Sequence, residues 1–224
     1  MMIRRILRVV LLGFLLGLGI LVLQHRFDIP SETIRYWYPR IGIAVVILSA
    51  LGYSYYLRRF HKALYSLVEK YHTKDREAFL EENLKLLDRT KNKTHRALVK
   101  LNLSAAYAEL GRFQEAKELL DGIPEGRLTG ANQYVRIVNL TYMNFRLGHK
   151  QEALDLIDAH RDQLLALEKR GLMLSQSIEV NFIYEAVAKG EIQRAKELID
   201  AFQKKDYAYH LDKDMEELKR LLEE

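Results

Sequence analysis

The chain has 224 residues, of which 49% are hydrophobic, and its formal net charge at pH 7 is +5. Because it contains no cysteine, disulfides, thiol catalysis and cysteine-ligated zinc are excluded. Residues 1–57 hold six arginines and two acidic residues, so most of the positive charge lies near the N-terminus and the rest of the chain is almost neutral. Basic residues interleaved with aromatic ones, as nucleic-acid binding requires, are not found, and we expect no nucleic-acid partner.

The first predicted element is an apolar helix over residues 6–23. Its centre, Val9–Leu23, carries no charge. When Arg8 extends toward the headgroups, the apolar helix begins at Ile6 and comes close to the ~20 residues that cross a bilayer. A cleaved signal peptide also combines an arginine-rich start with an apolar core, but the small residues that cleavage needs do not follow Leu23.

The second predicted element is an apolar helix over residues 41–57, which again lacks charged residues. Aromatic residues, which favour the interface between membrane and water, lie at both of its ends. They are Tyr36, Trp37, Tyr38, Tyr53, Tyr55 and Tyr56. The two runs together predict a transmembrane hairpin, residues 1–57, which anchors a helical domain of residues 58–224 to a lipid bilayer.

The charges around the two spans predict the membrane topology, because arginine and lysine near a span tend to stay in the cytoplasm. Basic residues precede the first span and follow the second: Arg4, Arg5, Arg8, Arg58, Arg59 and Lys62. The segment between the spans, residues 24–40, holds three arginines against two acidic residues. We therefore expect a cell-membrane protein with two spans and with both termini in the cytoplasm.

Gly13 and Gly17 form a GxxxG step in the first span. Since glycine has no side chain, such a step lets two helix backbones approach closely and gain van der Waals contacts. Two interpretations are open. Either the two spans of one chain pack on each other, or the glycines pair with a second copy of the chain in a homo-oligomer.

Self-similarity is the strongest pattern in residues 58–224. Three segments of equal length align without gaps, starting at Leu101, Val138 and Val180. Each has Asn second, Gly eleventh, Ala sixteenth and Asp last: Asn102, Asn139, Asn181; Gly111, Gly148, Gly190; Ala116, Ala153, Ala195; Asp121, Asp158, Asp200. Because the four positions keep their order and spacing within every segment, the pattern indicates one structural unit repeated three times.

Each unit is predicted to be an antiparallel pair of helices. Apolar residues at helical spacing precede the glycine, which permits the left-handed backbone that ends a helix. After it, Ala116, Leu119 and Leu120 form an apolar stripe on a second helix, and the small alanine allows a close helix crossing. A pair of this kind cannot bury both faces alone and stacks on its neighbours. The three asparagines are interpreted as hydrogen-bonding residues between helices.

These units resemble the tetratricopeptide repeat (TPR) family through the Asn-Leu pair, the interhelical glycine and the alanine of the second helix. Tyr107 also matches an aromatic position of that family, whereas successive units are spaced more widely than the family's usual repeat length. The resemblance implies a solenoid of helix pairs whose first helices line a concave wall.

Two further elements complete the predicted solenoid. Residues 60–90 form a degenerate first pair, in which residues 81–88 align with the end of the other units and Ala78 takes the glycine position. A stripe in a charged C-terminal helix consists of Leu211, Met215, Leu218 and Leu222. We expect this helix to cap the last pair, and an alternative is that it occupies the groove. The predicted fold is all-α: a transmembrane hairpin, then a TPR-like solenoid of three clear helix pairs plus one degenerate pair, and a capping helix.

The chain carries no sequence pattern for catalysis: HExxH, a nucleophile elbow and a phosphate-binding glycine loop are all missing. The densest group of acidic and histidine residues is Asp155, Asp158, His160 and Asp162. We interpret it as the charged surface of a helix, because residues two apart do not face each other. We expect no catalytic residue, no bound metal and no cofactor.

By the resemblance, the concave wall receives a peptide or a segment of another protein. The predicted partner-binding residues are Val138, Tyr142, Phe145, Val180 and Tyr184. Such side chains favour an amphipathic helix or a hydrophobic segment, and the alternative is that they belong to the core. The sequence therefore predicts a non-enzymatic, membrane-anchored adaptor of a bacterium, which recruits a protein partner. The alternatives are a self-assembling scaffold and an enzyme with an unrecognised site.

Overall fold

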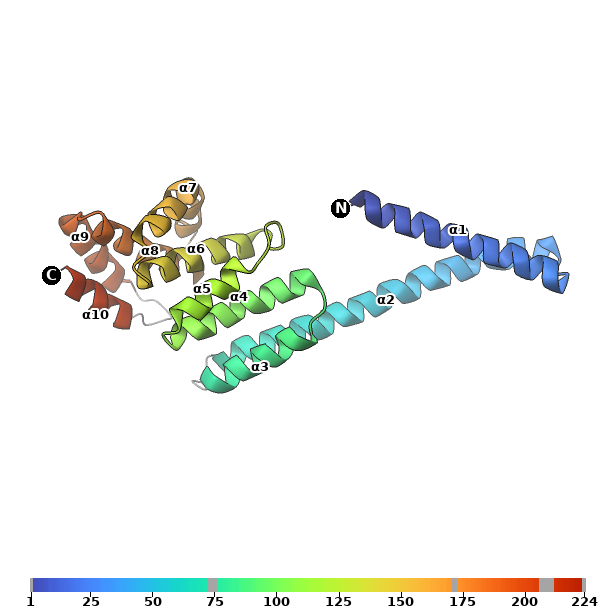
Figure 1. The fold of residues 1–224 in the computed structure, drawn as a ribbon, viewed down its shortest axis with the longest axis horizontal. Coiled ribbons are helices and arrows are strands. Elements are labelled where there is room, and N and C mark those ends of the chain that lie inside the picture. Colours follow the sequence, from blue (N-terminus) through green and yellow to red (C-terminus); the bar gives the residue numbers. More distant parts are fainter. Residues whose placement is uncertain (1, 72–75, 171–172, 206–211, 223–224) are drawn as a thin grey trace. The chain divides into compact units, whose positions relative to one another are not determined.

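The computed structural model describes residues 2–71, 76–170, 173–205 and 212–222 (Figure 1). These residues form ten α-helices and no strand, which confirms the all-α class. The helices are α1 Met2–Phe27, α2 Ser31–Tyr71, α3 Arg76–Arg89, α4 Lys93–Glu109, α5 Phe113–Asp121, α6 Ala131–Arg146, α7 Lys150–Glu168, α8 Met173–Ala188, α9 Ile192–Gln203 and α10 Asp212–Leu221. By compactness the chain divides into two units, Met1–Lys62 and Ala63–Glu224.

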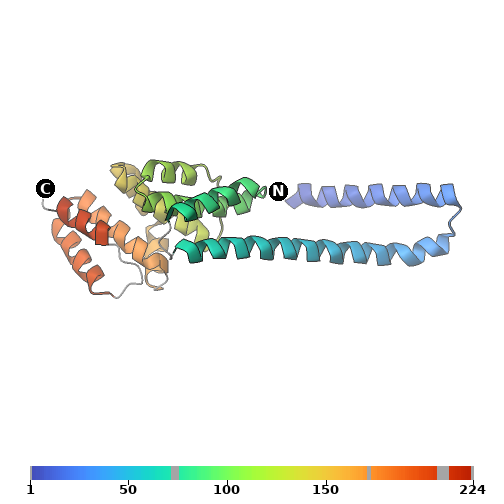
Figure 2. The ribbon, with the colours of Figure 1, turned by 90° about the horizontal axis from the view of Figure 1, so that it is seen from below.

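The first unit consists of α1 and most of α2, which a turn of residues 28–30 joins. α2 is 41 residues long and runs as one unbroken helix, drawn from blue to teal in Figure 2. Both helices extend beyond the apolar runs 6–23 and 41–57, because a helix needs backbone hydrogen bonds rather than apolar side chains to continue.

Many of the apolar side chains described in the first unit are exposed. In α2, for example, Ile41, Val46 and Leu51 are 58%, 67% and 61% exposed. Among the described residues, one helix is long and apolar enough to cross a membrane, over Ser31–Leu67, and its most apolar part is not buried in the protein. The apolar part of α1 that the structure describes, Gly13–Phe27, is shorter.

Gly13 and Gly17 face open space in the described chain. A methyl group added at either position would meet no heavy atom within 4 Å, and the same holds for Gly42 and Gly52 of α2. These glycines therefore make no close helix contact within one chain, and their role in helix packing stays a prediction.

In the second unit, each helix from α3 to α8 packs against the next helix along the chain. Short connections join them, so neighbouring helices run antiparallel (Figure 1). The alternate helices α4, α6 and α8 also contact one another in that order, and α10 contacts α8. The described helices of this unit thus form a stack of antiparallel neighbours.

The three predicted glycines each follow the end of a helix, α4, α6 and α8. Gly111, Gly148 and Gly190 have φ angles of +73°, +77° and +71°, which is the left-handed region that glycine enters at no steric cost. Each glycine N–H donates to the carbonyl three residues earlier, and the next N–H donates to the carbonyl five residues earlier. These two bonds make a Schellman motif at each site. The predicted role of the glycines as helix ends is confirmed.

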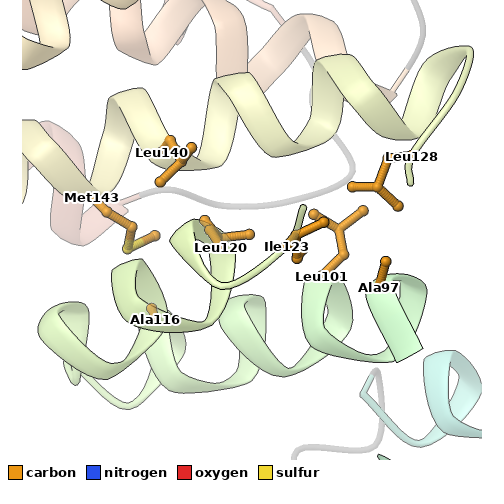
Figure 3. Close-up of a cluster of buried hydrophobic side chains, with 8 residues drawn as sticks. All are labelled: Ala97, Leu101, Ala116, Leu120, Ile123, Leu128, Leu140 and Met143. Atoms are coloured by element: carbon orange, nitrogen blue, oxygen red, sulfur yellow. The ribbon is translucent and has the colours of Figure 1, made fainter. Parts of the chain in front are cut away.

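The three predicted alanines are completely buried, since Ala116, Ala153 and Ala195 each have 0% exposed surface. In the core around Ala116, Leu101 comes from α4 and Leu140 from α6 (Figure 3). A small side chain at this position lets the second helix of the pair lie close to its neighbours. The burial of the three alanines is what a tight crossing requires, and the crossing itself stays a prediction.

The degenerate first pair is built from the end of α2 and from α3. Leu67 of α2, Phe79 of α3 and Ala106 of α4 form one buried cluster. The prediction that Ala78 takes the glycine position is wrong, because α3 begins at Arg76 and Ala78 lies inside it. Alanine is a strong helix former and has no preference for the left-handed conformation, so it continues a helix where glycine ends one.

Candidate functional site

The five predicted partner-binding residues do not share one surface. Val138 and Val180 are 1% and 2% exposed and belong to different core clusters. Tyr184 is also buried, whereas Tyr142 and Phe145 are half-buried. The ring of Phe145 stacks on that of Tyr184 at 5.5 Å between centroids, and the ring of Tyr142 meets it edge-on at 6.0 Å. The two valines are thus core residues, while the three aromatic residues form one group between α6 and α8.

The C-terminal helix α10 lies against this aromatic group. The Tyr142 hydroxyl donates to Asp214 Oδ1 at 2.6 Å, and the Tyr184 hydroxyl donates to the same oxygen at 3.4 Å. The Arg146 guanidinium donates to Asp214 at 2.9 Å and forms an ion pair with Glu217 at 2.7 Å. One carboxylate of α10 therefore receives donors from α6 and α8 together. We refer to Tyr142, Arg146 and Tyr184 as the tyrosine–arginine site.

Apolar contacts accompany these polar ones. Met215 and Leu218 of α10 are 5% and 0% exposed, and they pack with Tyr184 and with two residues of α9. Leu222 is half-buried, and Leu211, the first residue of the predicted stripe, lies outside the described residues. α10 therefore covers α8 and α9, as the capping prediction requires, and it also reaches α6 through its acidic residues.

Burial and charge keep the hydroxyls of the tyrosine–arginine site protonated. Burial raises the pKa of Tyr142, and the neighbouring Asp214 carboxylate raises it further. The pKa of Tyr184 is raised for the same two reasons. Burial lowers the pKa of Arg146, but the surrounding hydroxyls and carboxylates outweigh this effect and raise it. At neutral pH the site thus offers two hydroxyl donors and a permanent positive charge to a carboxylate.

A second buried polar group ties α7 to α8. The Glu185 side chain has 0% exposed surface and accepts hydrogen bonds from Arg161 and from Lys189, the latter at 2.6 Å. Burial raises the pKa of the Glu185 carboxyl, yet the hydrogen bonds from these two cations outweigh burial and leave the pKa lowered. Arg161 also bonds to Asp158 at 2.6 Å. Asp158 is exposed on α7, as the interpretation of its acidic cluster as helix surface requires.

The three repeated asparagines have different surroundings. The Asn181 side-chain amide donates to the Val138 carbonyl at 2.9 Å and so links α8 to α6. Asn139 is half-buried. The amide nitrogen of Asn102 is buried and finds no hydrogen-bond partner among the described residues. The predicted role of bonding between helices is confirmed for Asn181.

Sequence reasoning missed Arg146, Asp214 and Glu217. Arg146 directly follows the predicted wall residue Phe145, but a single arginine in a chain with 29% charged residues carries no pattern of its own. Its partner Asp214 lies 68 residues further on. The guanidinium also lies 4.4 Å from the ring centroid of Phe113 in α5. No local sequence motif predicts this cation–π contact. The available signal was a basic residue next to a predicted wall position, together with acidic residues beside the apolar ones of the last helix.

In the described part of the chain, no three acidic or histidine side chains lie close enough to hold a metal ion. Comparison of the chain with protein-family models, with curated proteins and with solved structures found no match. Function is therefore inferred from the chain's own residues and their geometry.

Proposed function

We propose that this protein is a membrane-anchored adaptor, which binds a protein partner on a TPR-like helical domain and holds it at the bilayer. The observation that carries the proposal is the make-up of α2. Its apolar stretch, residues 41–57, is exposed, and further along the same helix Leu67 is buried against Phe79 and Ala106. One unbroken helix thus supplies a surface suited to lipid and a side chain of the helical core.

The membrane part of the proposal has α1 and α2 as two spans with both termini in the cytoplasm. It is supported by the exposed apolar side chains of both helices, since soluble monomers rarely expose contiguous apolar patches of this size. The basic residues before the first span and after the second favour the cytoplasmic side for both ends.

Topology can be tested by cysteine labelling, because the natural chain has no cysteine. Ser31→Cys lies at the start of α2, between the two proposed spans, and Gln163→Cys lies on the exposed side of α7. An impermeant maleimide added to intact cells is expected to label the first variant, and to label the second only after the cells are lysed. Equal labelling of the two variants in intact cells contradicts the topology.

The TPR-like part of the proposal is supported by three recurring features. The glycine of each unit forms the same helix end, the alanine of each unit is buried, and α4, α6 and α8 contact one another in order. In a solenoid of this kind the first helices of the pairs line a concave wall, on which partners bind.

Partner recruitment can be tested by photo-crosslinking in cells. A photoreactive residue at Ala108, a half-buried position on the proposed wall, is compared with one at Gln163 on the second helix of a pair. We expect a protein to be captured at the membrane from Ala108 and not from Gln163. If both positions capture the same proteins, or if neither captures any, the adaptor proposal is wrong.

A second candidate function is a self-assembling membrane scaffold. The observation that favours it is the open space around Gly13 and Gly17, which leaves the glycine surface of α1 free for a second copy. Gly17→Leu is expected to turn a detergent-solubilised dimer into a monomer when its mass is measured by light scattering. A wild-type chain that is already monomeric contradicts this second function.

A further inference from the structure

α10 differs in composition from the other helices of the second unit. Seven of its ten residues are charged, and Met215 and Leu218 are its two fully buried apolar side chains in the described chain. An isolated helix of about ten residues is marginal in water, so the helical form of α10 depends on the surface it lies against. That surface is the tyrosine–arginine site together with the apolar cluster beside it.

The residues of α10 that make these contacts follow a simple pattern. Asp214 and Met215 are adjacent, and Glu217 and Leu218 repeat the same acidic–apolar pair three residues later. Residues three apart lie on one side of a helix, so the two acids face Arg146 of α6 while the two apolar residues enter the cluster with α8 and α9.

We propose that the tyrosine–arginine site is a recognition site for an amphipathic helix of a partner protein, and that α10 is its internal occupant. The partner helix would carry an acidic–apolar pair twice, three residues apart, and would displace α10 from the wall. This inference rests on the proposed adaptor function and adds to it the chemistry of the partner.

The chemistry of the contact supports recognition beyond simple covering of the core. A helix that only caps a stack needs apolar side chains, whereas Asp214 accepts from two tyrosine hydroxyls and a guanidinium at once. Buried, directional contacts to a carboxylate contribute more to specificity than to stability, because desolvation offsets much of the charge attraction. The Arg146 side chain retains 18% exposure, so an incoming carboxylate can reach it from solvent.

Tethering makes α10 a competitor for any partner. A segment joined to the same chain acts at an effective concentration on the order of millimolar, so a free helix with the same contacts binds weakly until α10 is loosened. Weakening the α10 contacts is therefore expected to strengthen binding of a helix added from outside.

The test uses the full chain in lipid nanodiscs and a fluorescent peptide with the sequence of residues 212–222. The Asp214→Asn/Glu217→Gln chain is expected to bind this peptide at least tenfold more tightly than the wild-type chain, by fluorescence anisotropy. A matched peptide carrying the same two substitutions is expected to bind the variant chain at least tenfold more weakly. Adding Arg146→Gln to the variant chain is expected to abolish the difference between the two peptides.

Equal binding of the two peptides by the Asp214→Asn/Glu217→Gln chain overturns the proposal. The peptide-binding result is meaningful only if the variant chain folds. Hydrogen exchange of the wild-type chain provides a second measurement that needs no variant. Saturating wild-type peptide is expected to raise the exchange rate of the α10 amides at least tenfold and to leave α8 protected. If the exchange of α10 does not change, α10 is a permanent cap and the proposal is wrong.

Two other outcomes have distinct meanings. In the first, the wild-type chain is a dimer and the Asp214→Asn/Glu217→Gln chain is a monomer. That result would mean that α10 of a second copy occupies the site, and it would overturn the proposal of a different partner protein. Failure of the peptide experiments together with specific crosslinking from Ala108 would refute this inference and leave the adaptor function standing.

Discussion

Glu185 carries its charge at a position with no exposed surface, and two cations, Arg161 and Lys189, both donate to its Oε1 atom. The equivalent positions of the first two units hold Ala106 and Met143, so the buried ion group belongs to the third unit alone among these three. It links α7 to α8, the helix that also carries Tyr184. The tyrosine–arginine site thus has a buried, hydrogen-bonded carboxylate at the residue next to Tyr184.

Replacing this carboxylate tests its contribution to stability. Glu185→Gln is expected to lower the free energy of unfolding by roughly 1–3 kcal/mol, because Arg161 and Lys189 lose their charged acceptor. Thermal melting followed by circular dichroism in detergent measures the loss, with Glu81→Gln as the control. Glu81 forms an exposed pair with Lys85 at 2.6 Å, and its loss costs about 0.5 kcal/mol or less.

The pH dependence of this difference follows from the lowered pKa of Glu185. A carboxyl whose pKa is lower when folded than when unfolded stabilises the protein above its ordinary pKa of 4.5, and the stabilisation is lost as the pH falls through the folded value. The difference in unfolding free energy between wild type and Glu185→Gln is therefore expected to be largest at pH 7 and to become smaller below about pH 4.5. If this difference in free energy stays constant down to pH 3, or increases, the conclusion that Glu185 is ionised in the folded protein is wrong.

A substitution at Gly148 tests whether the left-handed glycine at a helix end contributes to stability. Its φ angle is +77° and open space surrounds it, so Gly148→Ala is expected to cost about 1–2 kcal/mol through the backbone alone. Gly148→Asn is the matched control, because asparagine tolerates the left-handed region and is expected to lose less. The melting temperature would fall by about 2–4 °C for each kcal/mol lost. Equal stability of the alanine variant and the wild type would refute the argument.

At the scale of elements, the repeated pattern made the helix pairs predictable. Glycine and alanine act through the backbone and through close packing, so Gly111 and Ala116 mark a helix end and a crossing wherever they recur. Ala78 failed as a marker because alanine continues a helix, and α3 had already begun at Arg76. The apolar stripe of α10 predicted that it covers the last pair, α8 and α9. Its contact with α6 was not predictable, since the hydrogen bond from Tyr142 to Asp214 joins residues 72 apart and leaves no local pattern.

α10 is held as an element by few buried side chains, and Leu218 is the best test of its attachment. Leu218 has 0% exposed surface, and a buried Leu→Ala change costs about 2–5 kcal/mol. Because α10 follows the last helix pair, we expect Leu218→Ala to release α10 without unfolding α8. Hydrogen exchange with mass spectrometry is expected to show lost protection in α10 alone, and a smaller loss for Leu221→Ala, which is half-buried. Equal loss of protection in α8 would show that the helix is integral to the core.

At the scale of the whole molecule, the chain combines exposed apolar helices with a helical stack that has an ordinary buried core. The apolar runs were predictable from composition, whereas the continuation of α2 to Tyr71 was not, because its polar residues lack the hydropathy signal of a span. α2 thus includes both residues 41–57 and Leu67.

The most direct test of the account is sedimentation of the full-length protein with membranes after an alkaline carbonate wash. Exposed apolar helices that lie in a bilayer resist this wash, because leaving the lipid would expose them to water. We predict that the protein stays in the membrane pellet and is released by detergent. Recovery of the full-length chain in the wash supernatant would contradict the central claim that lipid covers the N-terminal helices.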